Sequence, residues 1–107
     1  MEEKIVPKRP EIDFEQLIVR LERNHRSVLR HAKDLNSYRF EPKNYECFTK
    51  LRELKAAFSI LGKAQMSLFD QIQHKLVSID KASQQVEESI REYQRLEKRL
   101  AEYLLSL

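Results

Sequence analysis

LFDQIQHKLVSIDKASQQVEESIREYQRLEKRLAEYLLSL, residues 68–107, shows the clearest structural pattern in the sequence. Apolar side chains recur in it every seven residues, and the same register continues back to Leu51. The first series, in which eight of nine residues are apolar, consists of Leu51, Phe58, Gln65, Ile72, Ile79, Val86, Tyr93, Leu100 and Leu107. A companion series, in which six of eight are apolar, consists of Leu54, Leu61, Leu68, Lys75, Ala82, Ser89, Leu96 and Tyr103. Such a heptad repeat is typical of helices that pack side by side in a left-handed supercoil.

The composition supports a helical chain and argues against a sheet. The 107 residues include one glycine and three prolines, and from Lys43 to Leu107 the only helix-weakening residue of these two types is Gly62. A sheet of several strands, a sandwich or a barrel needs many turns, and turns use these residues. The length suits one domain. We therefore predict an all-α protein, either a helical hairpin or a three-helix bundle with a long, coiled-coil-like C-terminal helix.

The N-terminal part divides at Asp13. Residues 1–13 hold two prolines and seven charged side chains, so we expect a flexible arm there. Asp13 followed by Gln16 resembles a capping box, which marks a helix start. Apolar residues then recur at helical spacing, and the first helix is predicted at about residues 14–35.

The remaining residues, about 44–107, form a second helical region within a single helical domain spanning residues 14–107. Tyr38 and Phe40, in the loop that precedes it, are expected to fold onto the helix ends. The region has a candidate break near residues 78–80, with Asp80 as the N-cap of a third helix. An unbroken helix would be about 95 Å long at about 1.5 Å per residue, and a first helix of about 33 Å could not cover it, so it would need another chain. Both arrangements remain open, and the three-helix arrangement is slightly favoured.

The heptad seam is the strongest candidate for a functional surface. It would serve as a bundle core within one chain or as an interface with another. In the second case the chain is a non-enzymatic interaction module, an adaptor or assembly subunit, that binds itself or another helical protein. Tyr93 and Tyr103 would be the main anchors, because aromatic residues dominate interface energies. The predicted interface consists of Leu68, Ile72, Ile79, Val86, Ile90, Tyr93, Leu96, Leu100, Tyr103 and Leu104.

Positive charge is concentrated in the first half of the chain. Residues 14–69 hold 11 basic and 6 acidic side chains, a formal charge of +5, whereas residues 70–107 have a formal charge of −1. Several basic residues of the first helix recur at three- and four-residue steps and so share a face. A basic helical face can follow a phosphate backbone, so the alternative function is a small nucleic-acid-binding protein. The candidate contacts are Arg20, Arg23, Arg26, Arg30 and Lys33.

Residues with catalytic or metal-binding chemistry form no complete set. Glu22 and His25 have the spacing of a di-iron helix motif, but the second such motif is missing. Asp70 and His74 share a helix face without further carboxylates. Cys47 falls on the companion heptad series, so we expect it to pack as a small hydrophobic residue. We predict no enzymatic activity, no metal and no cofactor.

The sequence also bears on location. The N-terminus, MEEKIVPKRP, is charged and lacks the apolar run of a secretory signal. No window approaches the roughly 18 apolar residues that span a bilayer. A single cysteine cannot form an intramolecular disulfide, as is common in reducing compartments. These observations lead us to expect an intracellular, cytoplasmic protein whose partners are proteins, with nucleic acid as the alternative and no membrane span.

Overall fold

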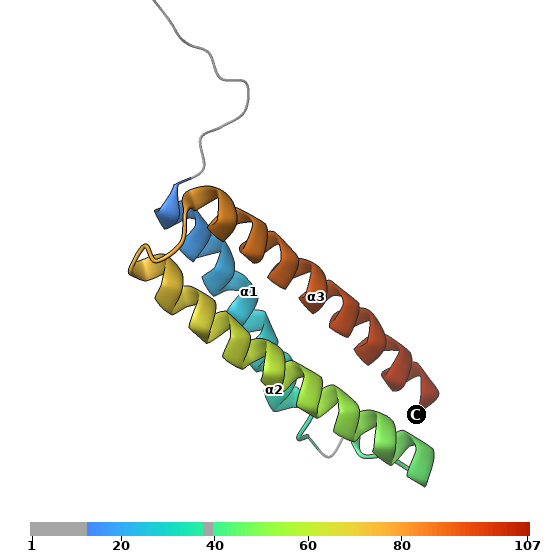
Figure 1. Cartoon of the computed structure of the whole chain (residues 1–107). Coiled ribbons are helices and arrows are strands. Elements are labelled where there is room, and N and C mark those ends of the chain that lie inside the picture. Colours follow the sequence, from blue (N-terminus) through green and yellow to red (C-terminus); the bar gives the residue numbers. More distant parts are fainter. Residues whose placement is uncertain (1–12, 38–39) are drawn as a thin grey trace, which may run out of the picture.

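A computed structural model describes residues 13–37 and 40–107. It contains three helices, α1 (Phe14–Asp34), α2 (Tyr45–Gln73) and α3 (Ile79–Ser106). The helices lie side by side, with α1 and α3 running in one direction and α2 in the other (Figure 1). The prediction of an all-α, three-helix fold is confirmed, and the single long helix from residue 44 is excluded. The expected arm, except for Asp13, and Tyr38 lie outside the described residues.

Each helix begins at a side-chain cap. The Asp13 carboxylate accepts a hydrogen bond from the backbone N–H of Gln16, at 2.8 Å. The Asn44 side chain accepts one from Cys47 N–H, also at 2.8 Å, and the Ser78 hydroxyl accepts one from Lys81 N–H, at 3.2 Å. These bonds satisfy backbone donors that have no partner within the helix. The cap of α3 is therefore Ser78, and the prediction of Asp80 was wrong by two residues.

The turn after α2 separates the two long helices. Lys75 adopts a left-handed backbone conformation with φ of 54°. Its N–H bonds to the carbonyl of Ile72, and the N–H of Leu76 bonds to the carbonyl of Gln71. This pair of bonds is a Schellman motif, which ends a helix and usually has glycine at the left-handed position. Because lysine stands there instead, the sequence carries no glycine signal for the stop.

The core lies along the bundle axis in two apolar clusters. The larger cluster, at the end where α2 begins, is built from Val28, Leu35, Cys47, Leu51, Leu54, Phe58, Leu61, Tyr93, Leu96, Leu100 and Tyr103. The smaller cluster, at the other end, is built from Leu17, Leu21, Leu68, Ile72, Ala82 and Val86. Burying large apolar side chains contributes about 1.5–3 kcal/mol each, so these clusters are the main source of stability. Most of the heptad residues belong to them.

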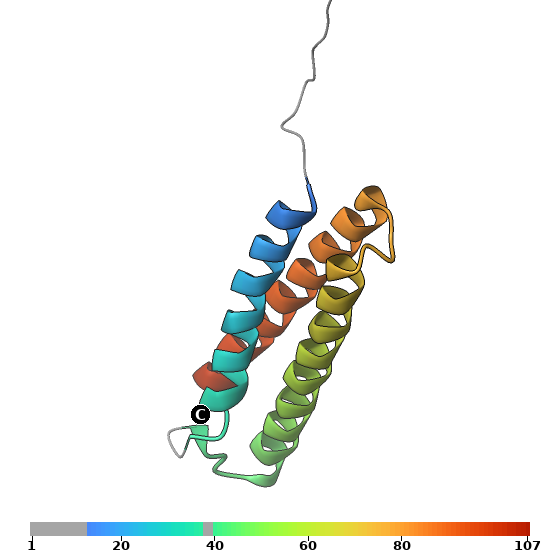
Figure 2. The ribbon, with the colours of Figure 1, turned by 90° about the vertical axis from the view of Figure 1, so that its left-hand side faces the viewer.

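The connection between α1 and α2 closes the larger cluster. Helix α1 has 21 residues, whereas α2 and α3 have 29 and 28, so α1 ends before it covers the start of α2. The chain after α1 crosses that end of the bundle (Figure 2). There Leu35 is buried and Phe40 is packed against the core. The Tyr103 hydroxyl donates a hydrogen bond to the Phe40 carbonyl at 2.6 Å. The prediction that Phe40 folds onto the helix ends is confirmed.

Candidate interaction surfaces

The structure places most of the predicted seam inside one chain. Of the ten residues proposed as an interface, seven are buried in the two core clusters, namely Leu68, Ile72, Val86, Tyr93, Leu96, Leu100 and Tyr103. Their partners are side chains of the other two helices of the same molecule. The seam is therefore filled by the chain itself, and a surface that binds another molecule has to lie on the outside of the bundle.

The other three seam residues depart from the prediction of buried contacts. Ile79 and Ile90 are only half-buried and pack against the smaller cluster. Leu104 is 39 % exposed, and Leu76, which follows the heptad position of Lys75, is 67 % exposed. The reason is geometric, because Leu76 lies in the turn and Leu104 lies beyond the end of α1, where no helix covers it.

A polar layer separates the two apolar clusters. Gln65, on α2, is fully buried. Its amide nitrogen donates to the Asn24 side-chain oxygen at 2.8 Å and to the Ser89 hydroxyl at 3.0 Å. Its amide oxygen lies 2.9 Å from His25 Nδ1, which is therefore the donor. The Gln65 side chain thus connects all three helices. From the sequence alone, Gln65 was only the one residue of its heptad series that is not apolar. The available signal was that Gln65 and Ser89 are two of the three polar residues at heptad positions, the third being Lys75 in the turn after α2.

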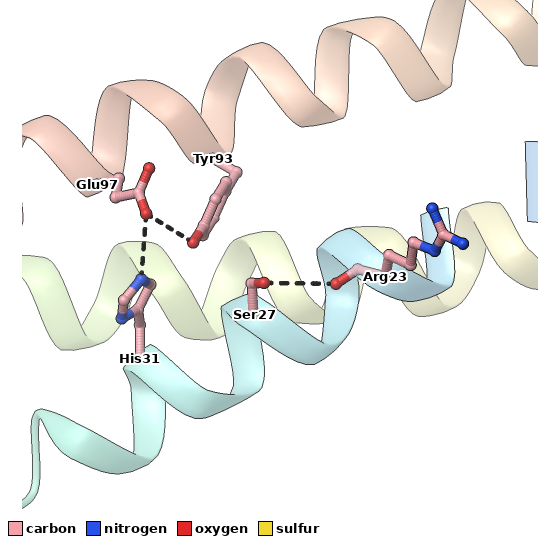
Figure 3. A network of polar contacts seen from close by, with 5 residues as sticks. All are labelled: Arg23, Ser27, His31, Tyr93 and Glu97. Atoms are coloured by element: carbon pink, nitrogen blue, oxygen red, sulfur yellow. Dashed lines mark hydrogen bonds and ion pairs between the residues drawn. The ribbon is translucent and has the colours of Figure 1, made fainter. Parts of the chain in front are cut away.

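A second polar network lies between α1 and α3 (Figure 3). The His31 ring stacks on Tyr93, with centroids 5.7 Å apart, and meets the edge of Phe58. The Tyr93 hydroxyl donates to a Glu97 carboxylate oxygen at 3.0 Å, and His31 Nε2 lies 3.5 Å from the same oxygen. Glu97 thus accepts from one tyrosine and faces one imidazole, which fixes α3 against α1. Sequence analysis did not identify this network.

The groups of this network are suited to holding the helices together. Burial raises the pKa of the Tyr93 hydroxyl, and its hydrogen bond to Glu97 raises it further, so the phenol keeps its proton. Ser27 lies one turn from His31, but its hydroxyl donates to the backbone carbonyl of Arg23 at 3.4 Å (Figure 3). A nucleophilic serine needs its base within hydrogen-bond reach. The arrangement joins helices and offers no activated nucleophile.

The basic residues of α1 fall into two groups, those that form ion pairs and those that do not form them within the described chain. Arg20 bonds to Glu87 of α3 at 2.8 Å, and this contact lowers the pKa of the Glu87 carboxyl. Arg26 bonds to Glu22 at 3.4 Å within α1. Arg23, Arg30 and Lys33 are exposed and form no ion pair within the described chain. The predicted anion-binding set is therefore split, because Arg20 serves the contact between α1 and α3.

Helix α2 has an apolar strip on the side that faces away from the core. We call Ala57, Ile60, Ala64 and Ser67 the outer strip, since steps of three and four residues place them on one face. Ile60 is 68 % exposed, Ala64 and Ser67 are exposed, and Ala57 is half-buried. Small side chains allow a neighbouring helix to approach closely. The outer strip is thus an uncharged face around one large apolar residue.

A groove between α2 and α3 borders the outer strip. Its volume is about 390 Å³, and its lining includes Ala64 and Ser67 of the strip together with Gln85, Glu88 and Glu92 of α3. The side-chain oxygen of Gln85 is buried there without a hydrogen-bond partner. The groove exists because short side chains from α2 stand beside α3. It joins the uncharged surface of α2 to a charged wall on α3 that includes Glu88, Glu92 and Arg95.

The structure also shows the contacts of the other residues that were considered for catalysis or metal binding. Cys47 is buried and free, with its sulfur 4.0 Å from the Ser106 hydroxyl. His74 and Asp70 are exposed, and His74 Nδ1 lies 3.2 Å from Asp70 Oδ1. Within residues 13–37 and 40–107, no three side chains of metal-binding type gather at one point. None of the helices described is both long enough and apolar enough to cross a membrane.

A comparison with protein-family models, curated proteins and solved structures found no significant match to this chain.

Proposed function

We propose that the chain is a non-enzymatic protein-interaction module, an adaptor or assembly subunit, that binds through the exterior of α2. The observation that carries the proposal is the exposure of large apolar side chains on this helix. Ile60, in the outer strip, is 68 % exposed, although the opposite side of α2 already supplies the core. Met66 and Phe48, five helical turns apart on the side of α2 nearer α1, are 58 % and 45 % exposed. Exposed apolar side chains of this kind contribute to binding when a partner covers them.

The shape of the surface favours a helix as the bound element. The outer strip follows the three- and four-residue steps of a helix-packing face, and the adjoining groove would accept the ridge of a fourth helix. A fourth helix placed there would cover Ile60 and supply donors near the buried oxygen of Gln85. Helix-on-helix packing is also how the chain assembles its own core.

Nucleic-acid binding through α1 is the second candidate. It is supported by Arg23, Arg26, Arg30 and Lys33, which are all exposed on one helix. Binding of this kind falls steeply as salt rises, because it depends on displaced counterions. A fluorescent oligonucleotide titrated at about 50 mM salt therefore tests it, and no binding there would remove this candidate.

Site-specific crosslinking in the source cells tests the main proposal. A photo-crosslinking amino acid is placed at Ile60 in the outer strip, or at Lys98, an exposed position of α3, as the matched control. We expect position 60 to crosslink to a protein, either another helical chain or a second copy, identified by mass spectrometry. We expect position 98 to give at most a few per cent of that yield. Equal yields, or no protein adduct at position 60, would contradict the proposal.

A further inference from the structure

A second exposed surface lies where α1 and α2 pack against each other. Gly62 of α2 sits beside Val28 and Leu29 of α1, since a methyl group at Gly62 would lie 3.8 Å and 4.0 Å from those two side chains. Exposed residues one or two turns from Leu29 on α1 and from Gly62 on α2, with the adjoining Arg30 and Lys63, therefore border the same site. We call this surface the basic face, and it consists of Arg26, Leu29, Arg30, Lys33, Lys55, Ser59, Lys63 and Met66, all exposed.

The charge of the basic face is almost entirely positive. Five of its eight side chains are basic, and the nearest acid with a contact to them is Glu22, which bonds to Arg26 at 3.4 Å. Arg30, Lys33, Lys55 and Lys63 have no ion-pair partner within the described residues. By contrast, acids of α3 take part in contacts, as in the pairs of Glu87 with Arg20 and Glu92 with Arg95. Uncompensated like charges attract a partner of opposite sign.

The middle of the basic face is apolar. Leu29 is 53 % exposed and Met66 is 58 % exposed, and Gly62 beside them contributes no side chain. An apolar centre with a charged rim is the usual anatomy of a protein-binding site. Methionine suits such a centre because its flexible side chain adapts to the surface it meets. The face therefore has a place for apolar side chains and, around it, positions for carboxylates.

These features select among anionic partners. The bases of a single-stranded nucleic acid bind by stacking on aromatic rings, and none of the eight side chains of the face is aromatic. A phosphate backbone would use the basic rim and leave Leu29 and Met66 uncovered. An acidic amphipathic helix would use both, because its apolar side chains at three- and four-residue spacing lie between rows of carboxylates.

We propose that the basic face binds an acidic amphipathic helix of a partner protein. The apolar side chains of that helix would pack on Leu29 and Met66, which lie on either side of the buried Gly62, and its carboxylates would pair with the surrounding arginine and lysine side chains. On α2 the face extends from Lys55 to Met66, about 16 Å at about 1.5 Å per residue, so two to three turns of partner helix would cover it. The proposal rests on the proposed function and assigns a partner chemistry to a surface next to the outer strip.

An NMR titration of the 15N-labelled full chain tests the proposal. The probe is a blocked 15-residue peptide of glutamate and leucine, with leucines spaced three and four residues apart. A second peptide has the same composition with alternating leucines, and a third has lysine in place of glutamate. We expect the first peptide alone to shift signals of residues 26–33 and 55–66. We expect its affinity to fall at least tenfold between 50 and 300 mM salt, because the charges on the rim are exposed.

Matched variants locate the binding surface. Leu29→Glu combined with Lys63→Glu should weaken binding at least tenfold, and Lys33→Glu combined with Lys63→Glu should act similarly without changing an apolar residue. The control, Leu105→Glu combined with Lys98→Glu, makes the same substitutions as the first pair at exposed positions of α3. It should bind as the unmodified chain does, within twofold. Circular dichroism checks that each variant keeps its helical content.

Several outcomes would overturn the proposal. One is the absence of peptide-induced shifts, and another is equal binding of the alternating or lysine peptide. A third is tenfold tighter binding of a 15-nucleotide single strand or of vesicles containing phosphatidylserine at the same residues, which would make the face a nucleic-acid or lipid site. A crosslink at Ile60 without peptide binding would leave the proposed function intact and remove only this inference.

Discussion

Side chains recur at the same helical spacing on the inner and outer sides of α2, but only those of the inner side are fully buried. On the inner side Leu54, Phe58 and Ile72 are almost completely buried, whereas Ile60 on the outer strip is 68 % exposed. Both sets recur at steps of three and four residues. What differs is side-chain size, because the inner side holds leucine, isoleucine and phenylalanine and the outer strip holds mainly alanine and serine. In α2, large side chains at heptad spacing form the core, and the smaller side chains of the outer strip lie on the exposed surface.

Two aspartate substitutions, one in the core and one in the outer strip, should give the largest difference in the free energy of unfolding. Val86→Asp places a charge in the smaller core cluster, where Val86 is fully buried. We expect a loss of at least about 4 kcal/mol, which is a large part of the about 5–15 kcal/mol that stabilises a typical domain. Ile60→Asp should change the free energy of unfolding by less than about 1 kcal/mol, because aspartate there stays in water. Urea unfolding followed by circular dichroism measures both.

Similar losses in the two variants would contradict the comparison. They would mean that Ile60 is covered in solution, as it would be in a dimer. Light scattering on the same samples would then distinguish the cases, since the chain has a mass of 12.8 kDa.

The sequence predicted an all-α fold and slightly favoured three helices, for identifiable reasons. The apolar stripe of α1, the cap at Asp13 and the heptad through α2 and α3 all involve local spacing. The break between α2 and α3 was harder to read, because Ile72 and Ile79 keep the seven-residue step across it. The turn also uses Lys75 where glycine is usual, so the left-handed conformation has no signature in the sequence.

The surfaces were less accessible to sequence analysis. A heptad looks the same whether its partner is another segment of the chain or another molecule, so the seam could not be assigned to a core in advance. The basic face joins residues of α1 and α2 that are about thirty positions apart in the sequence, and only the packing of Leu29 beside Gly62 brings them together. The sequence of α1 alone suggested five basic contacts, but one of them, Arg20, is paired with Glu87 of α3.

The polar layer provides the second test, with a smaller expected effect. Gln65→Ala should lower the free energy of unfolding by about 2–4 kcal/mol, because it leaves a cavity and removes the partners of Asn24, His25 and Ser89. Gln73→Ala, on the exposed end of the same helix, should change it by less than about 0.5 kcal/mol. Thermal and urea unfolding of both variants give the comparison. An effect as small for Gln65 as for Gln73 would show that the layer contributes nothing to stability.

Gly62 lies on the boundary between the two sides of α2 and gives the smallest and most local test. Glycine inside a helix costs up to about 1 kcal/mol relative to alanine, so a reason to keep it must be steric or functional. The steric reason is weak, because an added methyl group would meet Val28 and Leu29 at 3.8 Å and 4.0 Å, which is ordinary contact. We therefore expect Gly62→Ala to raise the free energy of unfolding by about 0.5–1 kcal/mol in urea. The control, Ala64→Gly in the outer strip, should lower it by a similar amount. A loss of stability in Gly62→Ala would show that α1 and α2 are packed too closely there to admit a methyl group. A gain would show that the packing of α1 on α2 admits a methyl group at this position, as the distances to Val28 and Leu29 indicate.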